Sequence, residues 1–415
     1  MVPSPPASEP SLRRAHHLAG VKYEIRGPLA RRAFELERLG HEIIKLNIGN
    51  PAQFGFRTPA SMRQAIIENL PQAEGYCHQK GIFPAREAVV MDAQARDIRG
   101  VTVDDVFMGN GVSELILMTM EALLEPGDEV LVPAPDYPLW TAAVTLTGAR
   151  PVHYPCHAKN AFVPDADEIE KLIGPKTRAL VLINPNNPTG AVYPADVLEA
   201  LVRVAERHRL VVFSDEIYDR ILYDGAKHVP VATLCQDTLC ATFGGLSKVY
   251  RACGLRCGWV FFSGRKHGAE DYLEALELLA SLRLCSNVPG QWAVQTALGG
   301  HQSIYELTAD GGRLGRQRKA LLEGVGRSPY LHVVAPKGAL YAFPSVDTHA
   351  VPDFDDHRFA MALLEEEHVL VVPGSSFNVN YTNHLRLTLL PEEDTIREVF
   401  VRMDRLLSRW TATPP

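Results

Sequence analysis

The chain has 415 residues, of which 46% are hydrophobic and 22% charged, and its formal net charge at pH 7 is -7. One hydrophobic core stops growing at roughly 250 to 300 residues, so the length predicts two domains. The negative charge gives no electrostatic footprint for nucleic acid, and no run approaches the roughly 18 apolar residues of a membrane helix.

The first segment, residues 1–20, is rich in proline, serine and alanine, and no apolar stretch follows its arginine pair. This composition predicts a flexible arm rather than a secretory signal, although a transit peptide stays open. Helical spacing follows over residues 26–40, and the segment IIKLNIGNP then predicts a short strand that ends in a loop at Gly49 and Asn50.

From about residue 60 to 300, apolar runs alternate with helical segments such as 194–208. The runs include EVLVPAP, ALVLINP, LVVFSDE and the stretch around CGWVFFSG. This alternation predicts an α/β fold with a mainly parallel sheet that carries helices on both faces. Ligands of open sheets of this kind bind outside the carboxyl ends of the strands.

After residue 310 the pattern changes, because GALYAFP, VLVVPGS and LRLTLL read as strands within a smaller α+β domain. We assign the early strand near residue 45 to the same domain. The predicted organisation is a large domain of residues 60–300 and a smaller domain of residues 21–59 and 301–415, preceded by the arm.

The segment FGGLSKVYRACGLRCGW, residues 243–259, places Lys248 among small residues. Small neighbours leave room for a flat, bulky ligand close to the backbone, and a desolvated lysine has a lowered pKa that frees its amine for attack on a carbonyl. Ser247 and Arg256 supply a hydroxyl and a forked cation suited to a phosphate monoester. The combination indicates pyridoxal phosphate, whereas an isolated Ser-Lys pair is usually a surface lysine on a turn.

Two turn motifs offer ligand-binding groups at strand ends. In GNGVSEL, Gly111, Val112 and Ser113 follow the strand-like VFM and open a helix, whose backbone N–H groups and dipole can bind phosphate. In NPNNPTG, residues 184–190, two prolines fix the backbone while three asparagines offer amides to a ligand. The structural alternatives are a plain connection for the first motif and a turn satisfied by its own backbone for the second.

Three further motifs place aromatic or charged side chains where they can meet a ligand. Asp215 follows the strand LVVF, with Tyr218 three residues later, and a carboxylate beside a pyridine nitrogen keeps that nitrogen protonated. Tyr137, between two prolines, is a rigid aromatic that can stack on a planar cofactor, and Arg386 in HLRLTLL is a buried cation that needs a carboxylate. The alternatives are a helix cap for Asp215, core packing for Tyr137 and a structural salt bridge for Arg386.

The motifs GNGVSEL, NPNNPTG, SDEIY and GLSKVYRACGLRCGW occur in this order, and the chain thereby resembles the class I/II, fold-type I aminotransferases, which depend on pyridoxal 5'-phosphate. The resemblance covers about residues 20–410. It is most specific to the bacterial alanine:2-oxoglutarate (glutamate-pyruvate) aminotransferases, through YEIRGP, LNIGNPAQFGF, EGYCHQKGI, APDYPLWTAAV and LRLCSNVPGQ.

The resemblance implies a role for each candidate residue. Lys248 is expected to form the Schiff base with the cofactor, Asp215 to bind its ring nitrogen, Tyr137 to stack on its ring, and Asn187 with Tyr218 to donate to its phenolic oxygen. Gly245 departs from the pattern, since many relatives carry a phosphate-binding serine there. The remaining implied contacts are Gly111, Val112, Ser113, Ser247, Arg256 and, from the neighbouring subunit, Tyr76 for the phosphate, and Gly49, Asn187 and Arg386 for the substrate carboxylate.

The expected reaction is transamination between L-alanine and 2-oxoglutarate, which gives pyruvate and L-glutamate, in a homodimer. A pocket that accepts both a methyl group and a distal carboxylate favours a mobile cation, for which Arg26 beside Tyr23 is the candidate; a local cap or ion pair is the alternative. Seven cysteines without CxxC pairs favour reduced thiols in a cytoplasmic protein, with no metal site.

Three other functions stay open on the sequence alone. They are an aspartate or aromatic aminotransferase, a lyase that uses the same cofactor, and a non-enzymatic regulator that binds it. The regulator is disfavoured because the segment before residue 20 is too short for a helix-turn-helix domain. An NAD-dependent oxidoreductase is also disfavoured, since no GxGxxG follows a strand.

Overall fold

The structure is a computed structural model, and it describes residues 27–412 together with residues 13, 15, 18 and 21. Most of the predicted arm, and both Tyr23 and Arg26, therefore lie outside the described residues. Within the described part of the chain, no helix is long and apolar enough to cross a membrane.

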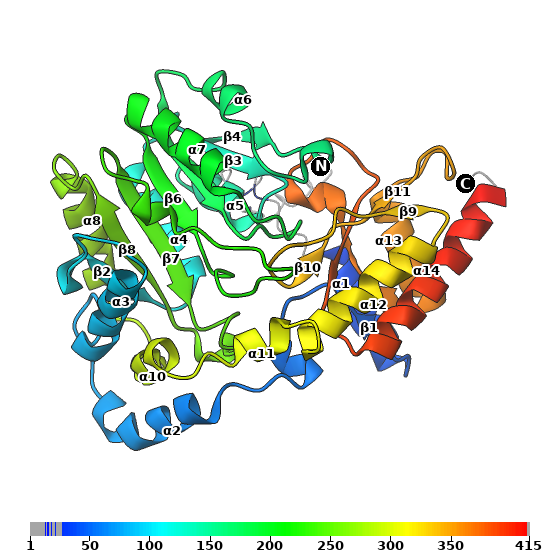
Figure 1. Cartoon of the computed structure of the whole chain (residues 1–415), viewed down its shortest axis with the longest axis horizontal. Coiled ribbons are helices and arrows are strands. Elements are labelled where there is room, and N and C mark those ends of the chain that lie inside the picture. Colours follow the sequence, from blue (N-terminus) through cyan, green and yellow to red (C-terminus); the bar gives the residue numbers. More distant parts are fainter. Residues whose placement is uncertain (1–12, 14, 16–17, 19–20, 22–26, 413–415) are drawn as a thin grey trace, which may run out of the picture.

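The largest sheet of the described chain has seven strands (Figure 1). Its order is β2-β8-β7-β6-β5-β3-β4, and only β8 runs antiparallel to its neighbours, so the prediction of a mainly parallel sheet is confirmed. In chain order the strands are β2 (Val106–Gly109), β3 (Glu129–Ala134), β4 (Arg150–Pro155), β5 (Thr177–Ile183), β6 (Val211–Asp215), β7 (Leu239–Gly245) and β8 (Gly258–Gly264).

Helices cover both faces of this sheet because alternate strand residues are apolar on both sides. On β5, Val181 packs in the cluster that contains α4, α5 and α8, whereas Leu182 packs in the cluster that contains α3 and α7. The helices of this part are α2 (Ala60–Asn69), α3 (Phe83–Ala95), α4 (Val112–Leu123), α5 (Leu139–Leu146), α6 (Ala166–Glu170), α7 (Ala195–Arg207), α8 (Glu270–Leu282), α9 (Val288–Gln291) and α10 (Val294–Gly299).

Short strands and five further helices lie beside the large sheet (Figure 1). The early strand β1 pairs in parallel with β12, and β14 lies between β10 and β13 as their antiparallel neighbour. The elements are α1 (Pro28–Arg38), β1 (Ile44–Lys45), α11 (Ile304–Thr308), α12 (Arg313–Arg327), β9 (Leu331–His332), β10 (Tyr341–Ala342), β11 (Ser345–Val346), α13 (Asp356–Glu367), β12 (Val369–Leu370), β13 (Val372–Pro373), β14 (Leu385–Thr388) and α14 (Glu393–Ala412).

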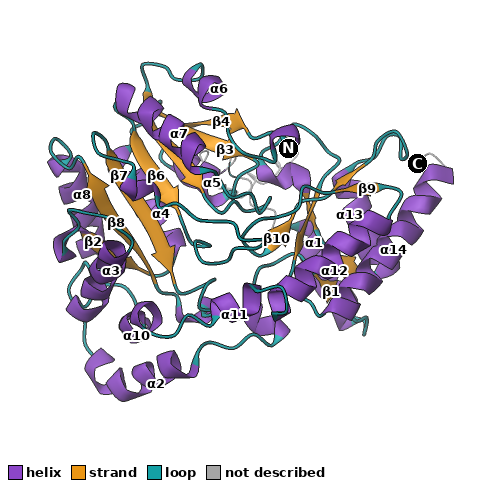
Figure 2. Cartoon of the chain, in the orientation of Figure 1, coloured by secondary structure: helices purple, strands orange, loops and turns teal. Residues whose placement is uncertain are grey.

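The loops after β5, β6 and β7 extend from the carboxyl edge of the large sheet toward β10 (Figure 2). Those loops hold the motifs NPNNPTG, SDEIY and GLSKVY, and β14 on the opposite side holds Arg386. The fold therefore gathers motifs that are far apart in the sequence at one edge of the sheet, where open parallel sheets bind ligands.

Candidate active site

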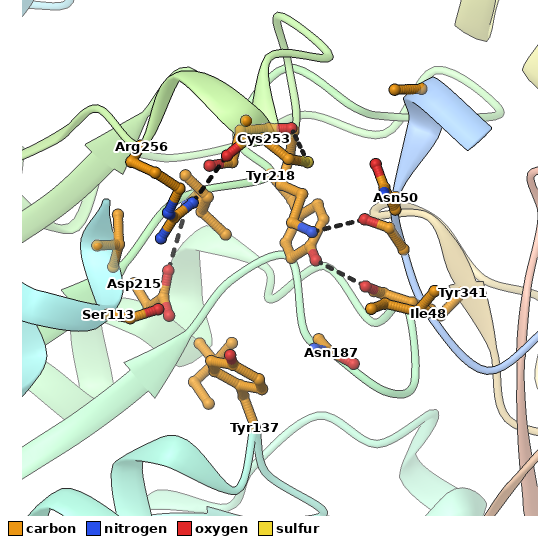
Figure 3. Close-up of a pocket in the computed structure, with 18 of the residues that line it drawn as sticks. Ile48, Asn50, Ser113, Tyr137, Asn187, Asp215, Tyr218, Cys253, Arg256 and Tyr341 are labelled. Carbon is orange, nitrogen blue, oxygen red and sulfur yellow. Dashed lines mark hydrogen bonds between the residues drawn. The ribbon is translucent and has the colours of Figure 1, made fainter. Parts of the chain in front are cut away.

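A cavity of about 600 Å³ lies between the loops of the large sheet and the strands β10 and β14. Arg256 and Ser113 lie on one side of it, Asn50 and Tyr341 on the opposite side, and Tyr137 below both (Figure 3). The cavity brings together the following predicted residues: Gly49, Val112, Ser113, Tyr137, Asn187, Asp215, Tyr218, Ser247, Lys248, Arg256 and Arg386.

Lys248 lies in the loop that joins β7 to the antiparallel β8. Its Nζ donates a hydrogen bond to the carbonyl oxygen of Gly49 at 2.7 Å, so the amine bridges the two sides of the cavity. Our explanation for the preceding glycines was wrong: a Cβ on Gly244 would lie 2.6 Å from Nε1 of Trp259. That glycine makes room for a buried indole of the protein rather than for a ligand.

One end of the cavity carries groups that can hold an anion. Gly111 precedes α4 with a φ of 81°, and no side chain caps the helix, whose first residues Val112 and Ser113 line the cavity. The Arg256 guanidinium donates to the carbonyls of Cys253 at 2.9 Å and Asn110 at 3.2 Å. A Cβ on Gly111 would come within 2.3 Å of Nη2 of Arg256, so only glycine lets the helix and the cation converge.

Asp215 is the last residue of β6 and is buried. One carboxylate oxygen accepts a hydrogen bond from Nε1 of Trp140 at 3.1 Å, and the other accepts the backbone N–H of Ile217 at 3.3 Å. Burial raises the pKa of Asp215 to about 6, although both hydrogen bonds oppose that rise. No helix begins directly after Asp215, since residues 217–220 form a turn, so the helix-cap alternative is wrong. The carboxylate lines the cavity and can hold a cation there.

The three asparagines of residues 184–190 have different surroundings: two bind other residues of the protein and one lines the cavity. Oδ1 of Asn184 accepts the N–H of Tyr193 at 2.9 Å, and Oδ1 of Asn186 accepts the hydroxyl of Thr189 at 2.8 Å. The turn alternative is therefore right for Asn186, whereas Asn184 binds Tyr193 beyond the motif and its buried Nδ2 has no hydrogen-bond partner. Only Asn187 of the three lines the cavity.

Arg386 lies at the end of the cavity opposite the helix α4 and is 1% exposed. Its guanidinium donates to Oδ1 of Asn187 at 3.2 Å and to the carbonyl of Asn47, and its Nε is buried without a hydrogen-bond partner. None of the carboxylates in the described chain pairs with Arg386, so the structural salt bridge proposed as an alternative is absent there. A buried cation with an unsatisfied N–H is a binding group for a ligand carboxylate.

An ion network outside the cavity supports the segment that carries Asp215 and Tyr218. Nη2 of Arg96 lies 2.8 Å from Oε2 of Glu216, which is buried, and Nη1 lies 3.3 Å from Asp219. We expect Arg96→Met to lower the free energy of unfolding by roughly 3 kcal/mol, because it leaves the Glu216 charge buried without its partner. Urea unfolding measures this, with Arg99→Met as the exposed control; equal stability of the two variants would contradict the prediction.

Four predicted residues do not line this cavity within the described chain, and one of them is Gly111, which precedes α4 beside Arg256. The side chain of Tyr76 is 82% exposed and does not line the cavity, and Tyr23 and Arg26 lie outside the described residues. The sequence reasoning also missed Tyr341, which lines the cavity, and Trp140, which holds Asp215. A signal for Trp140 existed in APDYPLW, whereas nothing local in GALYAFP distinguishes Tyr341 from a core residue.

The chain is similar to proteins of known family. The family model described as "Aminotransferase class I and II" matches residues 41–402. The "Glutamate-pyruvate aminotransferase AlaA" of Escherichia coli (strain K12) is 49% identical over 397 residues, which cover 96% of this chain and 98% of that protein. The "Alanine aminotransferase" of Mycobacterium tuberculosis (strain H37Rv) is 48% identical over 391 residues, or 94% of this chain and 91% of that protein.

A solved structure of an aminotransferase from Escherichia coli superposes with a TM-score of 0.94 at 49% identity and covers 96% of this chain and 98% of its own. This agreement confirms the fold predicted from the sequence. Within the described residues no group of three or more histidine, cysteine or acidic side chains is arranged to hold a metal ion.

Proposed function

Because the chain belongs to the class I and II aminotransferase family, we propose that it transfers an amino group between L-alanine and 2-oxoglutarate, giving pyruvate and L-glutamate. The observation that carries the reaction type is Lys248, whose amine lies between an anion-binding end and the buried Arg386. The choice of substrates is supported by the 49% identity to a glutamate-pyruvate aminotransferase over nearly the whole chain.

We propose pyridoxal 5'-phosphate as the cofactor, because the cavity offers a partner for each of its polar groups. The first turn of α4, with Ser113, Ser247 and Arg256, suits the phosphate, and the buried Asp215 suits the ring nitrogen. A bound anion would interact with Arg256 where its guanidinium approaches Gly111. A bound cation would stabilise the Asp215 carboxylate, whose pKa is raised by burial. When bound, the cofactor supplies a ring that withdraws electrons from the substrate's α-carbon.

The protein's own groups would hold the reactants and move one proton. Asp215 would keep a proton on the ring nitrogen, Asn187 and Tyr218 would donate hydrogen bonds to the ring oxygen, and Tyr137 would stack on the ring. The Nζ of Lys248 would take the proton from the α-carbon as general base and, as general acid, return it to a carbon of the cofactor. Arg386 fixes the carboxylate and so sets the direction of the α-carbon's C–H bond.

Arg386→Lys tests the carboxylate-binding role. We expect kcat/KM for L-alanine to fall by about 10- to 100-fold, mainly through KM, because lysine keeps the charge but loses the forked pair of hydrogen bonds. Steady-state kinetics measures this. Arg358→Lys is the matched control, since Arg358 also lies over an aromatic ring but is exposed outside the cavity; an equal effect in both variants would contradict the role.

We also propose a cytoplasmic homodimer in which Tyr76 reaches the partner's phosphate site. The exposed apolar side chains Ile67, Leu70, Tyr76 and Phe83 support this, and a hydrogen bond of 2.8 Å from Gln79 to Glu277 places their segment beside α8. The free cysteines fit a reducing compartment. Analytical ultracentrifugation tests the assembly: a wild-type monomer at all concentrations would overturn it.

A panel of amino donors with 2-oxoglutarate tests the reaction. L-alanine, L-aspartate and an aromatic amino acid are compared by 2-oxo acid release and by the visible spectrum of the bound cofactor. The highest kcat/KM is expected for L-alanine. A preference for aspartate or an aromatic donor, elimination without an oxo-acid acceptor, or a spectral change without turnover would instead identify another aminotransferase, a lyase or a regulator.

A further inference from the structure

Tyr341 contacts both ends of the proposed substrate site. It begins β10, is buried, and pairs with Thr388 of β14, two residues beyond Arg386. The Arg386 guanidinium carbon lies 4.5 Å above the centre of its ring. Its hydroxyl oxygen accepts a hydrogen bond from the Tyr218 hydroxyl at 3.2 Å (Figure 3). One phenol therefore joins the carboxylate-binding cation to the tyrosine proposed to bind the cofactor's ring oxygen.

The position of this hydroxyl depends on Gly49. A Cβ on Gly49 would lie only 2.1 Å from the Tyr341 hydroxyl oxygen, so any other residue there would displace the phenol. The carbonyl of the same glycine accepts the hydrogen bond from Nζ of Lys248 at 2.7 Å. The phenol and the lysine amine thus lie beside the same residue of the loop after β1.

The charges around the two phenols differ. Burial raises the pKa of Tyr341, but the positive charges of Lys248 and Arg386 and the hydrogen bond from Tyr218 outweigh burial and leave that pKa lowered. Burial and the neighbouring Tyr341 raise the pKa of Tyr218 well above its ordinary value. Of the pair, Tyr218 is therefore the phenol that is harder to deprotonate, which suits a donor of a hydrogen bond to a ligand oxygen.

We propose that Tyr341 is a positioning residue that couples the two ends of the site: its hydroxyl orients and polarises Tyr218, and its ring supports the Arg386 guanidinium. When a ligand oxygen accepts a hydrogen bond from the Tyr218 hydroxyl, the Tyr341 hydroxyl turns and donates its own hydrogen bond to the Tyr218 oxygen. Both phenols stay protonated, and the two hydrogen bonds form a chain in which each strengthens the other. This proposal rests on the proposed function, since Tyr218 and Arg386 act there on cofactor and substrate.

Two substitutions separate the hydroxyl from the ring in the enzyme loaded with pyridoxal phosphate. Tyr341→Phe keeps the ring below Arg386 and removes the hydroxyl, whereas Tyr341→Leu removes both. The first readout is the pH at which the visible absorbance of the bound cofactor changes. The second is the Kd of propionate, which has the carboxylate and methyl group of alanine but no amine and cannot react.

For Tyr341→Phe we expect the absorbance transition to move upward by about 0.4 to 1 pH unit, because a weaker donor stabilises the anionic ring oxygen less. The Kd of propionate is expected to stay unchanged. For Tyr341→Leu we expect the same upward movement and, in addition, a Kd raised by about fivefold through loss of the ring below the cation.

The matched control is Tyr223→Phe. Tyr223 is also buried, donates its hydroxyl to the carbonyl of Ala339 at 3.0 Å and has Arg318 over its ring, but it does not line the cavity. Neither readout is expected to change in this variant. A wild-type absorbance transition in Tyr341→Phe overturns the proposal, whether or not Tyr341→Leu folds. A wild-type protein that neither binds pyridoxal phosphate nor transaminates would overturn the proposed function instead.

Discussion

Replacing Lys248 with alanine is expected to lower kcat for L-alanine by about 10^4-fold or more, because the proton on the α-carbon then has no base at hand. Of the described residues that line the cavity, only Lys248 carries an amine. The remaining charged groups cannot replace it, because a guanidinium has no lone pair to accept a proton and the Asp215 carboxylate is held by Trp140. Single-turnover and steady-state assays measure the loss.

Cofactor binding separates this chemical role from a structural one. Lys248→Ala keeps the anion-binding end of the cavity, so we expect the variant still to retain pyridoxal phosphate, with an absorbance spectrum changed from that of the wild type. Lys171→Ala, an exposed lysine at the end of α6, is the matched control and should behave as the wild type. A Lys248→Ala variant that transaminates at the wild-type rate would refute the assignment.

Replacing Asp215 with asparagine is expected to lower kcat by about two to four orders of magnitude, because a buried amide cannot supply the negative charge that keeps the ring nitrogen protonated. The amide oxygen can still accept the hydrogen bond from Trp140, so the fold should persist. Kinetics and the Kd of pyridoxal phosphate measure the effect. Burial raises the pKa of Asp215 to about 6, so the buried carboxylate is stabilised when a cation binds beside it. Asparagine cannot form this charge pair, and the variant should therefore also bind the cofactor more weakly.

The control for this change is Asp237→Asn, which makes the same substitution at an exposed carboxylate. Its kcat should match that of the wild type. An Asp215→Asn enzyme with wild-type kcat and cofactor affinity would show that the ring nitrogen does not depend on this carboxylate.

Residues near a strand end in the sequence could be predicted to lie at the site. Asp215 lies two residues after the apolar run LVVF and ends β6, and Lys248 follows β7 by three residues, so the sheet alone brings them to one edge. The motif NPNNPTG predicted a ligand-binding loop. Only the fold shows that Asn186 binds its own turn, that Asn184 binds Tyr193, and that Asn187 lines the cavity.

Contacts between distant segments could not be predicted in this way. Tyr341 reaches Tyr218 because β10 pairs with β14 in a particular register, and no spacing in GALYAFP encodes that pairing. Similarly, the sequence suggests that Gly244 leaves space for a ligand, whereas the antiparallel pairing of Gly244 with Trp259 places an indole there. The division into domains and the roles of Tyr23, Arg26 and Tyr76 stay predictions.

The two halves of the cavity differ in how far apart in the sequence their segments lie, because β7 and β8 pair as an antiparallel hairpin. Gly245 lies opposite Gly258, so a single hairpin fixes Lys248 and Arg256 relative to each other over a short stretch of chain. The opposite half needs β1 and β14, which are separated by most of the sequence. The hairpin half has low contact order and can form early in folding, whereas the half around Arg386 must wait for the chain's last strands. Substitutions around Arg386 can therefore change which substrate carboxylic acid the enzyme accepts without disturbing the hairpin that holds Lys248.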